Sequence, residues 1–367
     1  MNKEIMYRSF LNRLFKIGNG LERYKVINCG INAFEYFIQK KRLSSMPVGA
    51  DIITTERCNL RCFYCKKYLG RPRDMTLETF ELISSKLFQN LLYVKFGSAG
   101  EHFLNRHFNE MLQICDDYKV DIFITSNGML VDKNWAEKLI LHRVKKVGIS
   151  LDGATEITAE SIRIGLDFKK VLNNIQNIVR LKKEYKTEYP KLSITYAAMR
   201  RNIEELPEFI ELAKNLGIDF IRVQHMYVHD FVDKNESLFF YPSLTDKMFQ
   251  LAKRKAKKMN IELWLPGSTN KSKKLNKKSF CHYPWKEIAI APDGRVNFCC
   301  GAWDYKALGN IIEEDFKDIW NNNTYQQLRR TVNSNKPIFT LCEHCTVLQR
   351  DPSDIRLYMD KVHCEKS

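Results

Sequence analysis

Hydrophobic and polar positions alternate along most of the chain in two rhythms. Short apolar runs rich in β-branched and aromatic residues predict strands. They lie at residues 50–55, 93–97, 121–125, 146–151, 192–196 and 220–224. Apolar residues spaced three and four apart predict the helices between them, at residues 77–91, 108–118, 134–142, 168–185 and 204–216. Six strands alternating with helices predict an α/β fold with a parallel sheet, in which functional side chains gather at the carboxyl ends of the strands.

Different patterns flank this alternating region. Residues 4–17 and 31–42 have apolar residues at helical spacing and predict a helical N-terminal extension. We expect this extension to pack against the main domain, with weak attachment to a membrane surface as the alternative. After about residue 226 the alternation stops, and a helix at 244–259 and a Lys-rich loop at 271–278 lead into a cysteine-rich segment. The resulting division is 1–47 (helical extension), 48–230 (α/β domain), 231–280 (connector), 281–350 (cysteine-rich domain) and 351–367 (tail).

Composition and charge narrow the classes of protein that fit. The 367 residues are 44% hydrophobic and 12% aromatic, as in an ordinary globular protein. They contain no apolar run of about 18 residues and no signal-peptide core, so we expect a cytoplasmic protein without a membrane span. The net charge of +16 permits an anionic substrate or an acidic protein partner. The lysines are scattered without a recognition motif, so we expect no nucleic acid, and a zinc-bearing nucleic-acid-binding protein is a remote alternative.

Three of the eleven cysteines follow the first predicted strand, at Cys58, Cys62 and Cys65. Cysteines in a chain of cytosolic character indicate metal binding or catalysis rather than disulfides. Their soft thiolates favour an iron–sulfur cluster or zinc. A closed zinc site needs four ligands, and no His or fourth Cys lies near this loop. Three thiolates leave one metal position open for a small molecule.

This loop, CNLRCFYC at residues 58–65, resembles the signature of the radical S-adenosylmethionine superfamily. The resemblance implies a partial (βα)6 barrel of TIM type. It also implies a 4Fe–4S cluster held by the three cysteines, whose fourth iron binds S-adenosylmethionine. One-electron reduction then cleaves the cofactor to a 5′-deoxyadenosyl radical that takes hydrogen from a substrate. By the same resemblance Tyr64 lies beside the adenine, although a core aromatic residue is the alternative.

Motifs at the next strand ends fit the same family. FGSAGE at 96–101 resembles its Gly-Gly-Glu segment, so Gly100 and Glu101 are expected at the methionine amino group. Ala99 stands where a glycine is usual, and His102-Phe103 stands where Pro-Leu is common. The role of Glu101 is therefore predicted more firmly than the conformation of the backbone around it.

The third and fourth strand ends complete the set of cofactor contacts. TSNG at 125–128 resembles the family turn near the ribose, which implies roles for Ser126 and Asn127. SLDG at 150–153, followed by Arg163, resembles the pair that holds the methionine carboxylate, which implies roles for Ser150 and Arg163.

A second group of cysteines lies near the C-terminus. A Pro-Asp-Gly turn at 292–294 predicts a hairpin that brings Cys281 towards Cys299, and Cys342 and Cys345 supply a second pair. Four thiolates alone permit structural zinc. The segment resembles the SPASM/twitch domain of radical S-adenosylmethionine enzymes, although it has fewer cysteines than a full one. The resemblance favours a single auxiliary 4Fe–4S cluster on these four residues and leaves Cys300 and Cys364 without a role.

Enzymes of this architecture fall into two substrate groups, carbohydrate-like small molecules and ribosomally made peptides. The N-terminal 45 residues are too short and too purely helical for the winged-helix module that many peptide modifiers carry. We therefore expect oxidation or epimerisation of a carbohydrate-like or other small molecule, with a peptide maturase as the alternative. Gln224 and His225 are expected to point across the barrel mouth, with His225 as a candidate general base. A flavodoxin or ferredoxin is the reductant that the resemblance implies.

Overall fold

The computed structural model describes residues 23–65, 72–229, 231–267, 280–303, 305–334, 336–343 and 345. Their centre is one curved sheet with the strand order β10-β9-β8-β1-β2-β3-β4-β5-β6-β7. The strands are β1 (Gly49–Ile52), β2 (Tyr93–Phe96), β3 (Asp121–Ser126), β4 (Lys146–Ser150), β5 (Lys191–Ala198), β6 (Phe220–His225), β7 (Glu262–Trp264), β8 (Glu287–Ile290), β9 (Arg295–Asn297) and β10 (Gly309–Asn310). β1 to β7 run parallel, which confirms the α/β class and is consistent with a partial TIM-like barrel.

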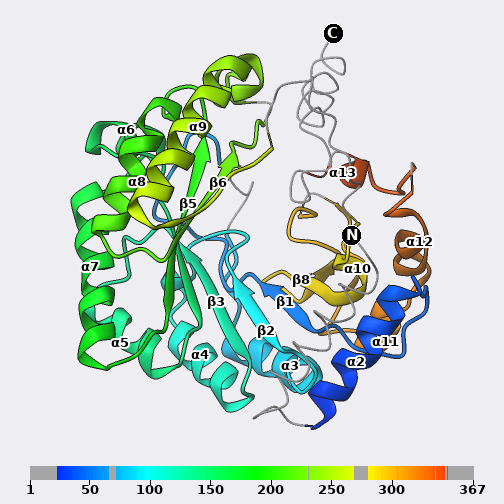
Figure 1. Cartoon of the computed structure of the whole chain (residues 1–367). Helices are drawn as coiled ribbons and strands as arrows, with labels where there is room; N and C mark the ends of the chain where they lie inside the picture. The colour runs from blue at the N-terminus through cyan, green and yellow to red at the C-terminus, as the bar shows by residue number, and fades with distance from the viewer. Residues whose placement is uncertain are drawn as a thin grey trace.

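Helices cover the outer face of this sheet (Figure 1). Those of the barrel are α3 (Leu77–Leu87), α4 (Phe108–Asp117), α5 (Lys133–Leu141), α6 (Glu156–Ile162), α7 (Phe168–Glu184), α8 (Leu206–Asn215) and α9 (Pro242–Met259). α7 shows why the sequence folds this way, because Val171, Ile175 and Ile178 form one buried stripe at helical spacing. Asp167 caps its N-terminus by accepting a hydrogen bond from the backbone N–H of Lys170.

One further helix–strand unit extends the barrel beyond its sequence prediction. The alternation ended at about residue 226 in the sequence, yet α9 packs on α8 and leads into β7, which pairs with β6 in parallel. β7 is only three residues long, and Glu262 and Trp264 on it are exposed. Such a strand has too few buried residues to give an alternating pattern. The predicted Lys-rich loop at 271–278 lies outside the described residues.

The cysteine-rich segment joins the same sheet instead of forming a separate one. β8 pairs in parallel with β1, and β9 and β10 follow as antiparallel neighbours. The hairpin predicted at 292–294 is confirmed between β8 and β9, where Gly294 has a φ of +80°. A Cβ atom there would lie 2.6 Å from Asn310 Oδ1. The helices of this region are α10 (Tyr283–Lys286), α11 (Phe316–Trp320), α12 (Asn323–Thr331) and α13 (Thr340–Glu343).

The N-terminal extension forms α2 (Arg23–Phe37), which lies beside α10 (Figure 1). It was predicted over 31–42, but it ends earlier because Gln39 adopts a left-handed conformation and Lys40 N–H turns back to the carbonyl of Glu35. The predicted packing against the main domain is present, but it uses the polar face of the helix: Asn28, Asn32 and Glu35 are buried. The helix predicted at 4–17 lies outside the described residues. None of the described helices has the length and apolar character that crossing a membrane requires.

Arg329 on α12 ties the extension to the C-terminal region. Its side chain is 2% exposed and donates to the carbonyls of Lys41, Pro284 and Trp320 at 2.8–2.9 Å. These carbonyls come from three separate segments, so one guanidinium group satisfies acceptors that no local structure pairs.

Replacing this guanidinium group tests how much it stabilises the fold. We expect Arg329→Met to lower the free energy of unfolding by about 2–4 kcal/mol, because buried carbonyls lose their donors. The neighbouring Arg330→Met is the control, since Arg330 is exposed. Urea unfolding of the two variants measures the difference, and equal unfolding midpoints would contradict the assignment.

Candidate functional site

The loop that carries Cys58, Cys62 and Cys65 is hydrogen-bonded along both of its edges. On one side the N–H of Glu101 donates to the carbonyl of Arg57 at 2.7 Å. On the other side the N–H groups of Arg61 and Phe63 donate to the carbonyls of Ile164 and Ile162 at 2.8 and 3.2 Å. The loop therefore lies between the segment after β2 and the end of α6.

Gly100 lets the segment after β2 approach this loop. It has a φ of +68°, and a Cβ atom on it would lie 2.0 Å from the carbonyl oxygen of Thr55. Only glycine fits such an approach. The substitution of Ala99 for the usual family glycine does not disturb it, because the close contact is at Gly100.

Glu101 is buried beside the loop and binds the turn after β3. Its carboxylate accepts hydrogen bonds from Ser126 Oγ at 2.9 Å and from the N–H of Asn127 at 2.8 Å. Burial raises the pKa of Glu101 to about 7, although these two donors act in the opposite direction. Asn127 in turn donates from Nδ2 to Asn59 at 2.8 Å and lies 3.9 Å from Cys58 Sγ. The predicted residues Glu101, Ser126 and Asn127 thus meet next to Cys58.

Arg163 stands on the other side of the loop in a buried polar cluster. Its Nε lies 2.8 Å from Asp152 Oδ2, its Nη2 donates to the hydroxyl of Tyr64 at 2.9 Å, and its Nη1 lies 3.8 Å from Cys62 Sγ. The Tyr64 hydroxyl also donates to Asp152 Oδ2 at 2.8 Å. Burial disfavours the charged guanidinium, but Asp152 outweighs burial and raises the pKa of Arg163. Asp152 therefore fixes both Arg163 and Tyr64.

Asp152 and Tyr64 make contacts that the motifs did not predict. Asp152 was visible in SLDG, yet the sequence did not show that it would pair with Arg163. Tyr64 uses its hydroxyl in the cluster, while its ring packs against a small apolar group that includes Ile162, Met199 and Met226. Ser150 is the last residue of β4, in register with Thr195 of β5.

The three thiols of the loop lie within electrostatic range of one another. Burial raises the pKa of Cys58, and it raises that of Cys62 to about 11 although Arg163 opposes it. Metal binding must therefore displace their protons. Among the described residues no three His, Cys, Asp or Glu side chains are close enough together to hold a single metal ion.

Two of the C-terminal cysteines, Cys299 and Cys300, follow the end of β9. The Cys299 thiol lies within electrostatic range of Cys300 and Cys345 and accepts a hydrogen bond from the N–H of Gly301 at 3.2 Å. The neighbouring Cys300, together with burial, raises the pKa of Cys299, while the pKa of Cys300 is lowered. Cys281 is buried, and its N–H donates to Asn333 Oδ1 at 2.7 Å. Cys342 is half-buried on α13.

Arg73 connects this region to the loop of the first cysteines. It donates to Glu56 from Nε at 3.0 Å and forms an ion pair with Asp293 in the β8–β9 turn. Lys95 on β2 pairs with Glu287 on β8 inside the barrel. The position of the C-terminal hairpin is thus set by charges on both sides of β1.

The inner face of the barrel carries polar residues that the motifs did not reveal. Asp51 on β1 is buried, accepts a hydrogen bond from Ser98, and has its pKa raised to about 6 by burial. A lone aspartate within an apolar strand is the sequence signal that could have found it. Across the barrel, Arg222 and Gln224 on β6 are exposed, and burial lowers the pKa of Lys146 on β4 to about 8.

His225 does not face the barrel mouth, contrary to expectation. Successive residues of a strand point to opposite faces, so Gln224 and His225 cannot share one. His225 packs against Phe249 of α9, and its Nε2 lies 3.2 Å from the carbonyl oxygen of Gly267. Burial lowers its pKa. This position on the helix side of the sheet places the imidazole away from the inner face, where a base for a substrate would lie.

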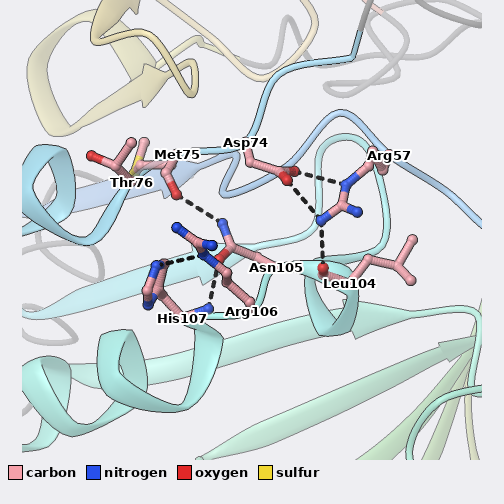
Figure 2. Close-up of a pocket in the computed structure, with 8 residues that line it drawn as sticks. All are labelled: Arg57, Asp74, Met75, Thr76, Leu104, Asn105, Arg106 and His107. Atoms are coloured by element: carbon pink, nitrogen blue, oxygen red, sulfur yellow. Dashed lines mark hydrogen bonds and ion pairs between the residues drawn. The ribbon is translucent and has the colours of Figure 1, made fainter.

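A cavity of about 410 Å³ lies behind the first cysteine loop (Figure 2). Arg57 borders it and is held by Asp74 and by the carbonyl of Leu104. Asn105 closes its floor by donating to the carbonyls of Thr54 and Met75. None of the predicted cofactor residues lines this cavity, so we assign it no role in cofactor binding.

Comparison with known families agrees with this geometry. Residues 52–213 match the Radical SAM superfamily, and residues 281–346 match the SPASM family, described as an iron–sulfur cluster-binding domain. The chain carries a radical SAM domain followed by a SPASM domain. The first match contains the cysteine loop and the three strand ends that carry the other motifs, and the second contains the C-terminal cysteines. Together the two domains imply 4Fe–4S clusters and S-adenosylmethionine as cofactors.

Relatives of this radical SAM protein differ in what they do. A probable GTP 3′,8-cyclase of Methanocaldococcus jannaschii is 31% identical over 45% of this chain, which matches only 55% of the length of that protein. The subtilosin biosynthesis protein AlbA of Bacillus subtilis is 24% identical over 92% of this chain and 72% of its own length. The solved structure of Streptococcus suis SuiB with bound S-adenosylmethionine has a TM-score of 0.63. It is 16% identical and covers 91% of this chain and 77% of SuiB, which shows a shared fold.

The close contact of Gly100 with the cysteine loop predicts that a side chain at this position sharply reduces metal binding. We expect Gly100→Ala to lose most of the iron of the first cluster, because the added Cβ would push the Thr55 backbone out of place. Gly30→Ala on α2 is the control, since its Cβ meets nothing within 4 Å. Iron content and the visible absorption of anaerobically reconstituted protein measure the effect. An unchanged iron content in Gly100→Ala would refute it.

Burial of Glu101 predicts a pH dependence of stability in the metal-free protein. Its pKa rises from 4.5 to about 7 on folding, so the folded protein binds one more proton than the unfolded chain between these values. Stability is therefore lost as the pH rises from 4.5 to 7, by about 2–4 kcal/mol. Glu101→Gln should remove this part of the slope. Urea unfolding of both proteins at pH 5 and pH 7.5 tests it, and identical slopes would argue against it.

Proposed function

We propose that this radical SAM enzyme modifies a ribosomally made peptide. The observation that carries the proposal is the similarity to AlbA, named for subtilosin biosynthesis, over 92% of the chain and through both domains. A structure of SuiB bound to its precursor peptide SuiA has the same fold, with a TM-score of 0.64. The absence of a winged-helix module favoured a small-molecule substrate in the sequence, but these relatives support the peptide alternative better.

The barrel mouth suits an extended substrate. Among the described residues β7 pairs with β6 alone, so its outer edge offers free backbone groups to an added strand. Arg222 and Gln224, exposed on the neighbouring β6, supply polar side chains to the inner face. An extended peptide can pair its own backbone with such an edge, whereas a carbohydrate has no backbone amides to pair.

We propose roles for the cofactor residues from their positions. Cys58, Cys62 and Cys65 ligate the first cluster, Glu101 accepts the methionine ammonium, and Arg163 pairs with the methionine carboxylate. When bound, the cluster and S-adenosylmethionine supply the radical that takes hydrogen from the substrate. Asp152 holds Arg163 in place, and the apolar group around Tyr64 offers a wall for the adenine.

Cys299 with Cys281, Cys342 and Cys345 is the proposed ligand set of one auxiliary cluster. Held by these residues, such a cluster would supply an electron acceptor. Crosslinking removes two hydrogen atoms from the peptide: the 5′-deoxyadenosyl radical takes one, and the other leaves as a proton and an electron. The reductant of the first cluster is proposed to be an acidic flavodoxin or ferredoxin. The net charge of +16 would favour such an acidic partner.

Coexpression with candidate peptides tests the proposal. Each short open reading frame that flanks the gene is expressed with the enzyme, and the peptide product is examined by mass spectrometry. We expect the loss of two hydrogen atoms per crosslink, or an unchanged mass with inverted chirality for epimerisation. Cys58→Ala should abolish both 5′-deoxyadenosine and the modified peptide. Cys299→Ala should lose about four irons per chain yet still form 5′-deoxyadenosine.

Cys29→Ala is the matched control, because Cys29 lies on α2 and is outside both proposed ligand sets. It should keep both products. Turnover of an aminocyclitol or sugar with no change in any peptide would overturn the peptide substrate. Zinc in place of iron would overturn the radical mechanism itself.

A further inference from the structure

The apolar face of α2 points away from the rest of the protein. Tyr24, Ile27, Ile31, Phe34 and Ile38 recur at spacings of three and four, which places them in one row along the helix. They are 41–62% exposed. With about 200 Å² for each fully exposed large side chain, the row presents roughly 500 Å² of apolar surface. A helix that packs on its own domain normally shows the opposite arrangement.

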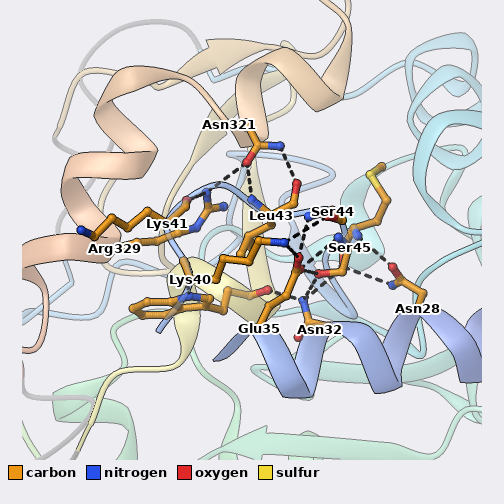
Figure 3. Close-up of polar contacts among 12 residues, drawn as sticks. Asn28, Asn32, Glu35, Lys40, Lys41, Leu43, Ser44, Ser45, Asn321 and Arg329 are labelled. Atoms are coloured by element: carbon orange, nitrogen blue, oxygen red, sulfur yellow. Dashed lines mark hydrogen bonds and ion pairs between the residues drawn. The ribbon is translucent and has the colours of Figure 1, made fainter. Parts of the chain in front are cut away.

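Polar contacts fix α2 in this orientation (Figure 3). Asn28 donates to the carbonyl of Met46 at 3.1 Å and accepts from the Met46 N–H at 2.8 Å. Asn32 donates to the carbonyl of Trp285 at 2.5 Å. Glu35 accepts from the N–H groups of Ser44 and Ser45 at 2.7 and 3.1 Å. Rotating the helix to bury its apolar row would leave all these buried groups unpaired, so the row stays outward.

The chain immediately before α2 has the features of a matching partner. Residues 4–17 carry Met6, Phe10 and Leu14 on one helical face, with Arg13 at its margin and with Arg8, Asn12 and Lys16 opposite. Fourteen helical residues extend about 21 Å, which is also the length of the row from Tyr24 to Ile38. Residues 18–22, which include Gly18 and Gly20, have the length of a connection between antiparallel helices.

We propose that residues 4–17 fold back as a helix on the apolar row of α2 and form a helical hairpin. In the antiparallel register Leu14 lies opposite Ile27, Phe10 opposite Ile31 and Met6 opposite Phe34. This places Glu4 towards the cations Lys41 and Arg42 beyond the end of α2.

Charge favours this occupant over a second copy of the protein. In an antiparallel α2–α2 pair Arg23 of one copy would lie towards Lys41 and Arg42 of the other, and in a parallel pair each of these cations would lie towards its own counterpart. All three residues are cationic and exposed. The hairpin avoids this repulsion and turns Arg8 and Lys16 outward to water.

A charge-pair exchange in the full-length holoprotein tests the register. Phe10→Glu and Ile31→Lys should each speed hydrogen exchange of the α2 amides by about tenfold, because each leaves the other helix without its apolar cover. The pair Phe10→Glu with Ile31→Lys should recover most of the protection, since the two charges face each other. The mismatched pair Phe10→Glu with Ile38→Lys should not.

The control is Ile157→Asp on α6, where the side chain is 83% exposed and no covering segment is proposed. Its exchange should be unchanged. Iron content reports whether the barrel is intact in every variant. Unchanged α2 exchange in Phe10→Glu overturns the hairpin. So does a wild-type dimer, or flotation of the wild-type protein with vesicles of phosphatidylcholine and phosphatidylserine, that Ile31→Lys abolishes and Phe10→Glu leaves intact.

Discussion

The barrel mouth depends on the close approach of two backbone segments, the cysteine loop and the turn at Gly100. The carbonyl of Thr55 occupies the space where any other residue would carry a Cβ atom. This contact lets the Glu101 N–H reach the carbonyl of Arg57, and it places the carboxylate of Glu101 under the turn after β3. The positions of Cys58, Glu101 and Asn127 relative to one another follow from it.

A second buried cluster sets the opposite wall of the site. Asp152 accepts from the Ala197 N–H at 2.7 Å and pairs with Arg163, so one carboxylate links β5, α6 and the cysteine loop. A buried carboxylate and guanidinium remain stable only because each has several partners. The anion at Glu101 and the cation at Arg163 therefore stand on two sides of the three thiols. This arrangement is complementary to an amino acid zwitterion.

Most of the barrel could be predicted from the sequence, because buried parallel strands and amphipathic helices leave strong periodic patterns. The strand-end motifs also named Glu101, Ser126, Asn127 and Arg163, which lie around the cysteine loop in the structure. The failures have physical causes. The pattern of α2 showed two faces but not which one would be buried, since the partners of Asn28 and Asn32 lie far away in the chain. The orientation of His225 could not be predicted either, because the pairing of β6 with β5 decides which residues of β6 face the inside of the barrel. The pairing of Asp152 with Arg163 depends on tertiary structure, and a motif cannot show it.

The pairing of β1 with β8 has a consequence for how the protein is made. Gly49 and Glu287 are partners in the sheet although 238 positions separate them. During synthesis β1 can pair with β2 early, but its other edge has no neighbour until residues 287–290 have left the ribosome. An open edge of this kind is a site for wrong pairing and aggregation. The edge of β1 therefore stays uncovered while the rest of the barrel is synthesised, and it is closed only when β8 becomes available.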